Sequence, residues 1–296
     1  CRIARTKGNL KSARKLAEAA EAEGRRHGWQ KVVARTLVDR GWDAFNAGDL
    51  ALGLSRMAEG AQLAERLADR SLQANSLRNQ AVLQLDRAVP DTVRALLEEA
   101  RALYQAIEHP QGMALAAINH AQLDRRHGHY ARAEAWLDQA AEHFMAGQTR
   151  WGLAMVIAER GLVRYLAGDL AGAEILLVEA VRRYGVVGGV NLPLAKLYLA
   201  ELRLAQGRRD EAWGMFAGLR EKLARETRHG RSLHAALGLL AVAADEGDWE
   251  SFDESLDFAR PLLDDHRAAG RDALRLAEEA ARRALGHDAP AQAAQA

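Results

Sequence analysis

The chain has 296 residues; 49% are hydrophobic but only 5% aromatic, and its 41 basic and 40 acidic side chains leave a formal net charge of +1. This balance gives no electrostatic reason to expect nucleic acid or an anionic membrane as a partner, and the single cysteine, Cys1, excludes internal disulfides and cysteine-based metal sites. The longest apolar run, near 235–244, is about half as long as a bilayer span requires, so we expect a cytoplasmic protein.

Helical patterns follow one another along the chain. Residues 1–7 resemble the tail of a truncated helix, and a second helix runs from the turn Gly8-Asn9 to about Glu23, so 1–28 is interpreted as a truncated first repeat. A capping helix is expected at 270–286 and a disordered tail at 287–296. Six helix pairs are predicted within 29–269: 29–47 with 49–68, 70–87 with 90–107, 111–127 with 129–145, 149–167 with 169–184, 190–206 with 208–226, and 230–246 with 248–266.

A turn glycine recurs at a step of 39 or 40 residues. Glycine can end the first helix of a pair because it adopts the left-handed conformation at little cost. In one repeat Val89-Pro90-Asp91 takes its place, since proline is tolerated in a first helical turn. Small residues also recur five and twelve positions after the turn and seven before it. The turn glycines are Gly8, Gly48, Gly128, Gly168, Gly207 and Gly247.

A fixed period with small residues at fixed positions predicts a stacked helical array. The pattern of a small residue, Gly-Asp-aromatic/Leu, and alanine at the fifth and twelfth positions resembles the tetratricopeptide (TPR) repeat over essentially residues 8–286. Its period exceeds the usual length of about 34 residues and is similar to the long-repeat subclass of kinesin light chains and of bacterial regulator and kinase–ATPase sensor regions. The resemblance implies an all-α solenoid, a right-handed superhelix of antiparallel helix pairs. HEAT or armadillo repeats share the length but do not explain the Gly-Asp turn.

No catalytic signature is found in the sequence. A GxxxxGK[ST] phosphate loop, the kinase HRD and DFG motifs, HExxH and GxSxG are all absent. His127 and His129 flank a turn, without a third metal ligand at a sensible spacing. We therefore predict a protein that is not an enzyme and needs no cofactor or metal.

One set of polar positions points to binding. Four polar residues stand nine positions before the turn in successive repeats, and equivalent positions of a stacked array align into a row along one face. In TPR proteins this row faces the concave groove, where asparagines hold the backbone of an extended peptide, so the resemblance implies a peptide-binding groove. We expect its side chains to project into solvent; a merely solvated polar row without a ligand is the alternative. The candidate groove residues are Asp39, Trp42, Asn79, Asn119, Gln122 and Glu159.

These observations favour a protein- or peptide-binding scaffold, interpreted as the C-terminal part of a larger bacterial signalling or regulatory protein. Its expected partners are a protein or peptide and an upstream domain of the same chain, with neither nucleic acid nor membrane. Two rival functions stay open. In one, the array is a sensor that binds a small effector or peptide and controls an attached output domain; in the other, it is an oligomeric spacer.

Overall fold

The computed structural model describes residues 10–46, 49–85, 88–187, 191–225 and 229–264, together with Ala280. Thirteen helices and no strand make up this part of the chain. They are α2 (Leu10–Arg26), α3 (Gln30–Asn46), α4 (Leu50–Arg66), α5 (Arg70–Gln84), α6 (Pro90–Ala106), α7 (Pro110–Arg126), α8 (Tyr130–Ala146), α9 (Arg150–Leu166), α10 (Leu170–Val187), α11 (Leu192–Ala205), α12 (Arg209–Arg225), α13 (His229–Glu246) and α14 (Trp249–Asp264).

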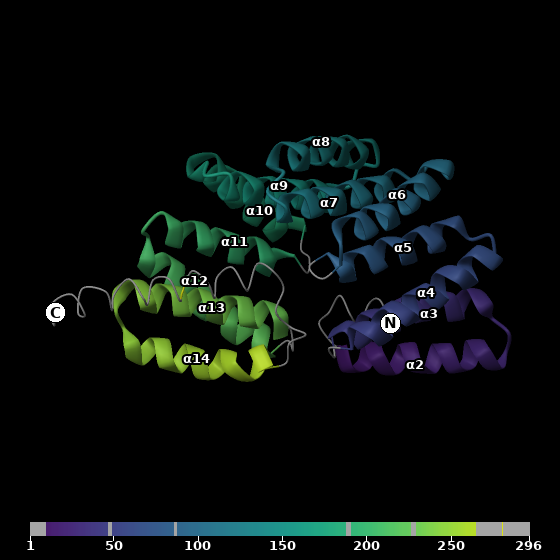
Figure 1. Ribbon diagram of the computed structural model, residues 1–296, viewed down its shortest axis with the longest axis horizontal. Coiled ribbons are helices and arrows are strands. Elements are labelled where there is room, and N and C mark those ends of the chain that lie inside the picture. Colours follow the sequence, from purple (N-terminus) through teal and green to yellow (C-terminus); the bar gives the residue numbers. More distant parts are fainter. Residues whose placement is uncertain are drawn as a thin grey trace.

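The helices stack as successive antiparallel pairs, so the predicted all-α solenoid is confirmed (Figure 1). Three helix ends differ from the prediction by about three residues: α2 continues beyond Glu23 to Arg26, α5 ends at Gln84 and not at residue 87, and α10 continues beyond residue 184 to Val187 and includes Gly185. A glycine in a helix costs only about 1 kcal/mol relative to alanine, which the last turn of α10 tolerates. The expected capping helix 270–286 lies outside the described residues except for Ala280, and the segments 1–9 and 287–296 lie outside them as well.

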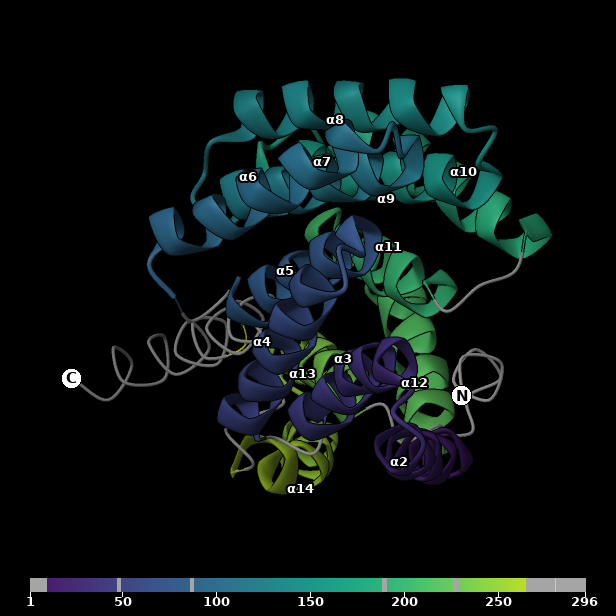
Figure 2. The same cartoon turned by 90° about the vertical axis from the view of Figure 1, so that its right-hand side faces the viewer.

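The array bends into an arch. Helices α6 to α10 form its top, and the helices before and after them descend on the same side, to α2 and α14 (Figures 1 and 2). Successive odd-numbered helices, from α3 to α13, contact one another in addition to their even-numbered neighbours. The odd-numbered helices therefore line the inside of the arch, and the even-numbered helices form its outer layer.

The turns within pairs follow the predicted chemistry. The φ angles of Gly128, Gly168, Gly207 and Gly247 lie between 72° and 90°, in the left-handed region. Aspartates cap the returning helices in three turns: the carboxylates of Asp49, Asp169 and Asp248 accept hydrogen bonds of 2.9, 2.9 and 3.1 Å from backbone N–H groups three residues on. Both features satisfy groups that a helix end leaves unpaired.

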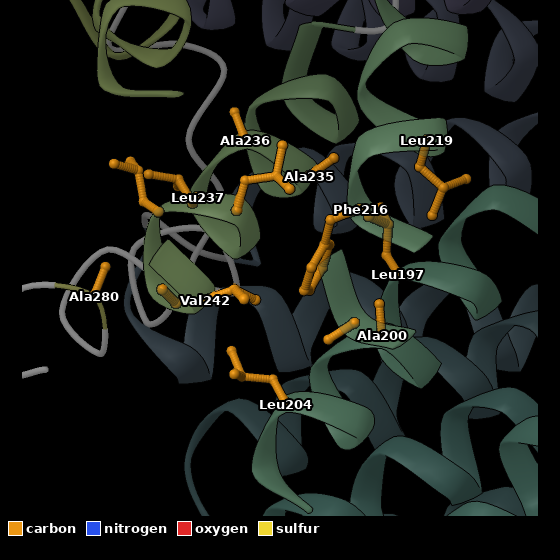
Figure 3. Packing of buried hydrophobic residues seen from close by; sticks show 14 of the residues in the cluster. Leu197, Ala200, Leu204, Phe216, Leu219, Ala235, Ala236, Leu237, Val242 and Ala280 are labelled. Carbon is orange, nitrogen blue, oxygen red and sulfur yellow. The ribbon is translucent and has the colours of Figure 1, made fainter. Parts of the chain in front are cut away.

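The core runs through the seams between pairs. Met57, Leu97, Leu137, Leu177 and Phe216, nine positions past successive turns, are all 0% exposed. At the C-terminal end the core cluster joins α11, α12 and α13 around Phe216 (Figure 3). Ala280 is 4% exposed and belongs to this cluster.

A recurring ion pair joins neighbouring repeats. In each case a residue six positions past one turn, on an outer helix, meets a residue of opposite charge four positions before the next turn. The sign is reversed in the first of the three pairs, so the contact depends on complementarity and not on one residue type. The pairs are Arg94–Asp124 at 3.1 Å, Glu134–Arg164 at 3.0 Å and Glu174–Arg203 at 2.5 Å.

Candidate functional site: a polar ladder on the inner helices

The predicted groove residues divide into two groups. Asn79, Asn119, Gln122 and Glu159 come together on the inner helices α5, α7 and α9. Asp39 and Trp42 occupy the same two repeat positions on α3, one repeat earlier, where both are half-buried.

The expectation that the side chains of this row project into solvent is wrong for Asn79, Asn119 and Glu159. Asn79 and Asn119 are each 7% exposed and Glu159 is 5% exposed. The cause is the contact between successive inner helices, which places this repeat position in the seam between α5, α7 and α9 instead of above it. A buried amide must be hydrogen-bonded, and the side chains bond to one another.

The hydrogen bonds run from repeat to repeat. Arg78 donates from Nη2 to Asn79 Oδ1 at 2.8 Å and from Nη1 to Asn119 Oδ1 at 3.2 Å. Asn119 Nδ2 then donates to Gln122 Oε1 at 3.1 Å, and Gln122 Nε2 donates to Glu159 Oε1 at 2.6 Å. We call this chain of five side chains the polar ladder. It links three repeats by hydrogen bonds.

Two arginines at the ladder were not among the predicted groove residues. Arg78 belongs to it, and Arg125 Nε lies 3.8 Å from Glu159 Oε2 beside its far end. A signal was present, because both stand at repeat positions that are otherwise apolar. The equivalents of Arg78 are Val38, Ile118, Ala158 and Leu197, and those of Arg125 are Phe45, Leu85, Tyr165 and Leu204.

The ladder keeps unused hydrogen-bonding capacity. Asn79 Nδ2 donates to no residue that the structure describes, and Asn119 Nδ2 uses one of its two hydrogens. Arg78 Nε is buried without a hydrogen-bond acceptor in the described chain. Such an unpaired donor costs about 1–3 kcal/mol, so the ladder is not fully satisfied by its own members.

A second polar contact continues along the inner helices toward the C-terminus. Glu201 on α11 and His234 on α13 lie 2.6 Å apart, Oε1 to Nε2, and are 1% and 5% exposed. Glu201 stands at the repeat position of Trp42 and Gln122, which was expected to line the groove. Apolar side chains lie one helical turn before the repeat position that Asn119 and Glu159 occupy. They are Leu115, Met155 and Leu194, and each is partly buried.

This arrangement is that of a TPR-like helical repeat protein: stacked helix pairs, an inner row of polar side chains, and an outer layer. None of its described helices combines the length and apolar character that a membrane span requires. No protein-family model matches the sequence, and no curated protein matches it.

Solved structures are similar in fold. One is the crystal structure of a Rap protein complexed with Competence and Sporulation Factor. The match covers 87% of this chain and 74% of the Rap chain, with a TM-score of 0.66 and 19% identity. The apo form of RapI matches 84% of this chain and 98% of its own, with a TM-score of 0.54 and 14% identity. Yeast Tom70 matches 95% of this chain and 60% of its own, with a TM-score of 0.56 and 15% identity. At these identities the likeness extends to the fold alone.

Proposed function

We propose that the inner face of the arch binds an extended peptide segment of another protein, and that the chain is the interaction module of a larger bacterial signalling or regulatory protein in the cytoplasm. The observation that carries the proposal is the polar ladder, which aligns amide side chains of successive repeats along α5, α7 and α9. The fold likeness to a Rap protein complexed with Competence and Sporulation Factor agrees with it.

Amide side chains are suited to a peptide backbone. An Asn side chain offers one acceptor and two donors, which match the N–H and C=O of a main-chain amide. Asn79 Nδ2 and the second hydrogen of Asn119 Nδ2 are the donors that a peptide carbonyl would accept from. The apolar Leu115, Met155 and Leu194, one turn away, would contact the side chains of the same peptide.

The charges of the ladder give the peptide a direction. Arg78 on α5 is basic, whereas Glu159 on α9, at the other end of the ladder, is acidic, as is Glu201 on α11 beyond the ladder. Complementary charges favour one orientation and one register of a bound partner. The peptide would therefore carry acidic residues where it passes α5 and basic residues where it passes α9 and α11.

Selection of short peptides from a displayed library against the folded chain tests this proposal. The affinity of a selected peptide should fall about tenfold for Asn79→Ala or Asn119→Ala, because one hydrogen bond contributes about 1–1.5 kcal/mol. Glu159→Gln should lower the affinity of peptides that carry basic residues at the α9 end. It should leave the affinity of peptides without such residues unchanged.

Two controls separate binding from stability, since both asparagines are buried. Gln80→Ala changes the adjacent residue of α5, whose side chain takes no part in the ladder, and should bind normally. Leu177→Ala should lower the free energy of unfolding by about 2–5 kcal/mol while retaining affinity below its melting point. Unchanged binding by both asparagine variants would show that the ladder is not the peptide site.

A further inference from the structure

The hydrogen bonds of the polar ladder all run in one direction. The Arg78 guanidinium at one end can only donate, and the ionised carboxylate of Glu159 at the other end can only accept. The oxygens of Asn79 and Asn119 both accept from Arg78. The oxygen of Gln122 accepts from Asn119, and Gln122 Nε2 donates to Glu159. No amide of the ladder can therefore turn over without losing a hydrogen bond, and all three amide oxygens already accept one within the chain.

The unused capacity of the ladder consists of N–H groups. Asn79 Nδ2 has two hydrogens that no residue of the described chain accepts, and the amide nitrogens of Asn119 and Gln122 have one each. Arg78 Nε is fully buried, whereas Asn79 Nδ2, which also lacks an acceptor in the described chain, is not. An amide oxygen with one hydrogen bond is close to satisfied, but an N–H group with none is not. The ladder therefore fits a ligand that supplies acceptors without donors.

Most peptide backbones supply both kinds of group. The edge of an extended strand presents N–H groups together with C=O groups, so some groups that face the ladder would be donors without an acceptor. Proline differs because it has no backbone N–H. Proline-rich segments adopt the polyproline II conformation, which has no internal hydrogen bonds and leaves every carbonyl free to accept. Such a segment matches a row of donors better than a strand does.

The apolar side chains beside the ladder suit the rings of proline. Trp151, Met155 and Glu159 follow one another at a spacing of four residues on α9, so they share one side of the helix. Trp151 is 37% exposed, and its indole packs edge-on against Phe144 with ring centroids 5.5 Å apart. Grooves that bind proline-rich segments are lined by aromatic side chains, and Trp151 supplies one next to the acidic end of the ladder.

We propose that the segment bound by the polar ladder is proline-rich, adopts the polyproline II conformation and contacts the ladder through its backbone carbonyls alone. This inference rests on the peptide-binding function proposed above and specifies the ligand. Asn79 Nδ2 and the second hydrogen of Asn119 Nδ2 donate to carbonyls of the segment, while Trp151 and Met155 contact its rings.

The isosteric variant Asn79→Asp tests the direction of the hydrogen bonds. It replaces the two free hydrogens by an acceptor, and its carboxylate can still accept from Arg78, so the melting temperature should not fall. The affinity for a proline-rich peptide without charged residues should drop at least about tenfold, because a hydrogen bond is lost. Gln80→Glu adds the same charge to the neighbouring residue of α5, whose side chain takes no part in the ladder, and should bind normally. Wild-type affinity in Asn79→Asp would mean that the ligand donates to this residue, and it overturns the inference.

Two displayed libraries, one with prolines at alternate positions and one without proline, test the class of ligand. The first should yield the tighter peptides, and N-methylation of any residue in them, which removes its N–H, should change the affinity by less than about twofold. A strand-like contact would instead lose about tenfold at alternate residues, the effect of one hydrogen bond, and that loss overturns the inference. Binders found only in the proline-free library, with an affinity that falls in Asn119→Ala, would contradict the proline-rich ligand and leave the peptide-binding function intact. Failure of both libraries would contradict that function as well.

Discussion

At the scale of single residues, the imidazole of His120 is 0% exposed and stacks on Trp136 with ring centroids 4.3 Å apart. Neither ring nitrogen has a hydrogen-bond partner in the described chain. Burial lowers the pKa of His120 to about 4; the nearby Arg94 and Arg101 act in the same direction, and Glu98 opposes them. The folded protein therefore holds this side chain neutral at pH values where an exposed histidine is charged.

The stability of the protein should consequently depend on pH through His120. Because its pKa is lower in the folded than in the unfolded chain, its contribution is fully present above pH about 6.5 and is lost as the pH falls toward 4. The slope should reach about 1.4 kcal/mol per pH unit within this window. Urea unfolding at several pH values measures it. His120→Phe should reduce the slope by this amount, and a slope that is the same in both proteins would contradict the assignment.

At the scale of elements, an aromatic ring of one pair packs on a glycine of the next. A Cβ added to Gly152 on α9 would lie 2.3 Å from Phe144 Cδ1 on α8, and one added to Gly112 would lie 2.2 Å from Tyr104 Cδ1. At the equivalent positions one repeat earlier, the sequence has Ala64 and Leu72, so the large and small residues are exchanged. In these three repeats one large and one small residue share the seam, in either order, whereas the next repeat has Tyr184 and Leu192 at the same two positions.

Gly152→Ala should therefore destabilise the protein by about 1–3 kcal/mol, the usual cost of overpacking. Gly214→Ala is the matched control, because nothing lies within 4 Å of its added Cβ, and it should stabilise α12 by about 0.5–1 kcal/mol. Phe144→Ala/Gly152→Leu, which copies the Ala64 and Leu72 arrangement, should be more stable than either single variant. Chemical unfolding of these variants, including the single variants Phe144→Ala and Gly152→Leu, measures the differences. Strictly additive effects of the two single changes would exclude the volume exchange.

The periodic sequence predicts these elements well because each turn has its own local chemistry. A left-handed glycine and an aspartate cap act within a few residues, so their positions can be found from spacing alone. The backbone conformation of the turns between pairs could not be predicted in the same way. Ala68, Glu108 and Gln148 have φ angles of 47° to 52°, at the repeat position that Gly28 occupies in the first repeat. Three non-glycine residues in a left-handed conformation give no local signal, since the packing of the helices on either side holds them there.

The polar ladder could be predicted only in part, for the same reason. Asn79, Asn119 and Glu159 were found because they share one repeat position. Their burial depends on how closely α5, α7 and α9 approach, and that distance is set by packing across repeats. Arg78 and Arg125 were missed because the repeat positions they occupy are those of the core, where a charged side chain was not expected. A charge at an otherwise apolar repeat position therefore deserves the same weight as a recurring polar one.

At the scale of the whole molecule, the arch separates two surfaces. The polar ladder lies on the inner helices, and the even-numbered helices form the outer layer (Figure 2). A peptide bound inside the arch would therefore leave the outer helices uncovered. Ile175 and Val178 are exposed on the outer helix α10 and take no part in the ladder, so the Ile175→Glu/Val178→Glu variant should retain peptide binding.

Small-angle X-ray scattering tests the shape and the choice between scaffold and sensor. A compact domain of this length would have a radius of gyration of about 19 Å, and the open arch should exceed that value. Adding a selected peptide should leave the radius nearly unchanged if the array is a preformed scaffold, since most preorganised interfaces move by about 1 Å or less. A clear decrease would instead mean that the inner face closes on its ligand, as the sensor function requires. The same titration on Asn79→Ala/Asn119→Ala shows whether such closure depends on the ladder, because a compaction that survives in this variant arises elsewhere in the arch.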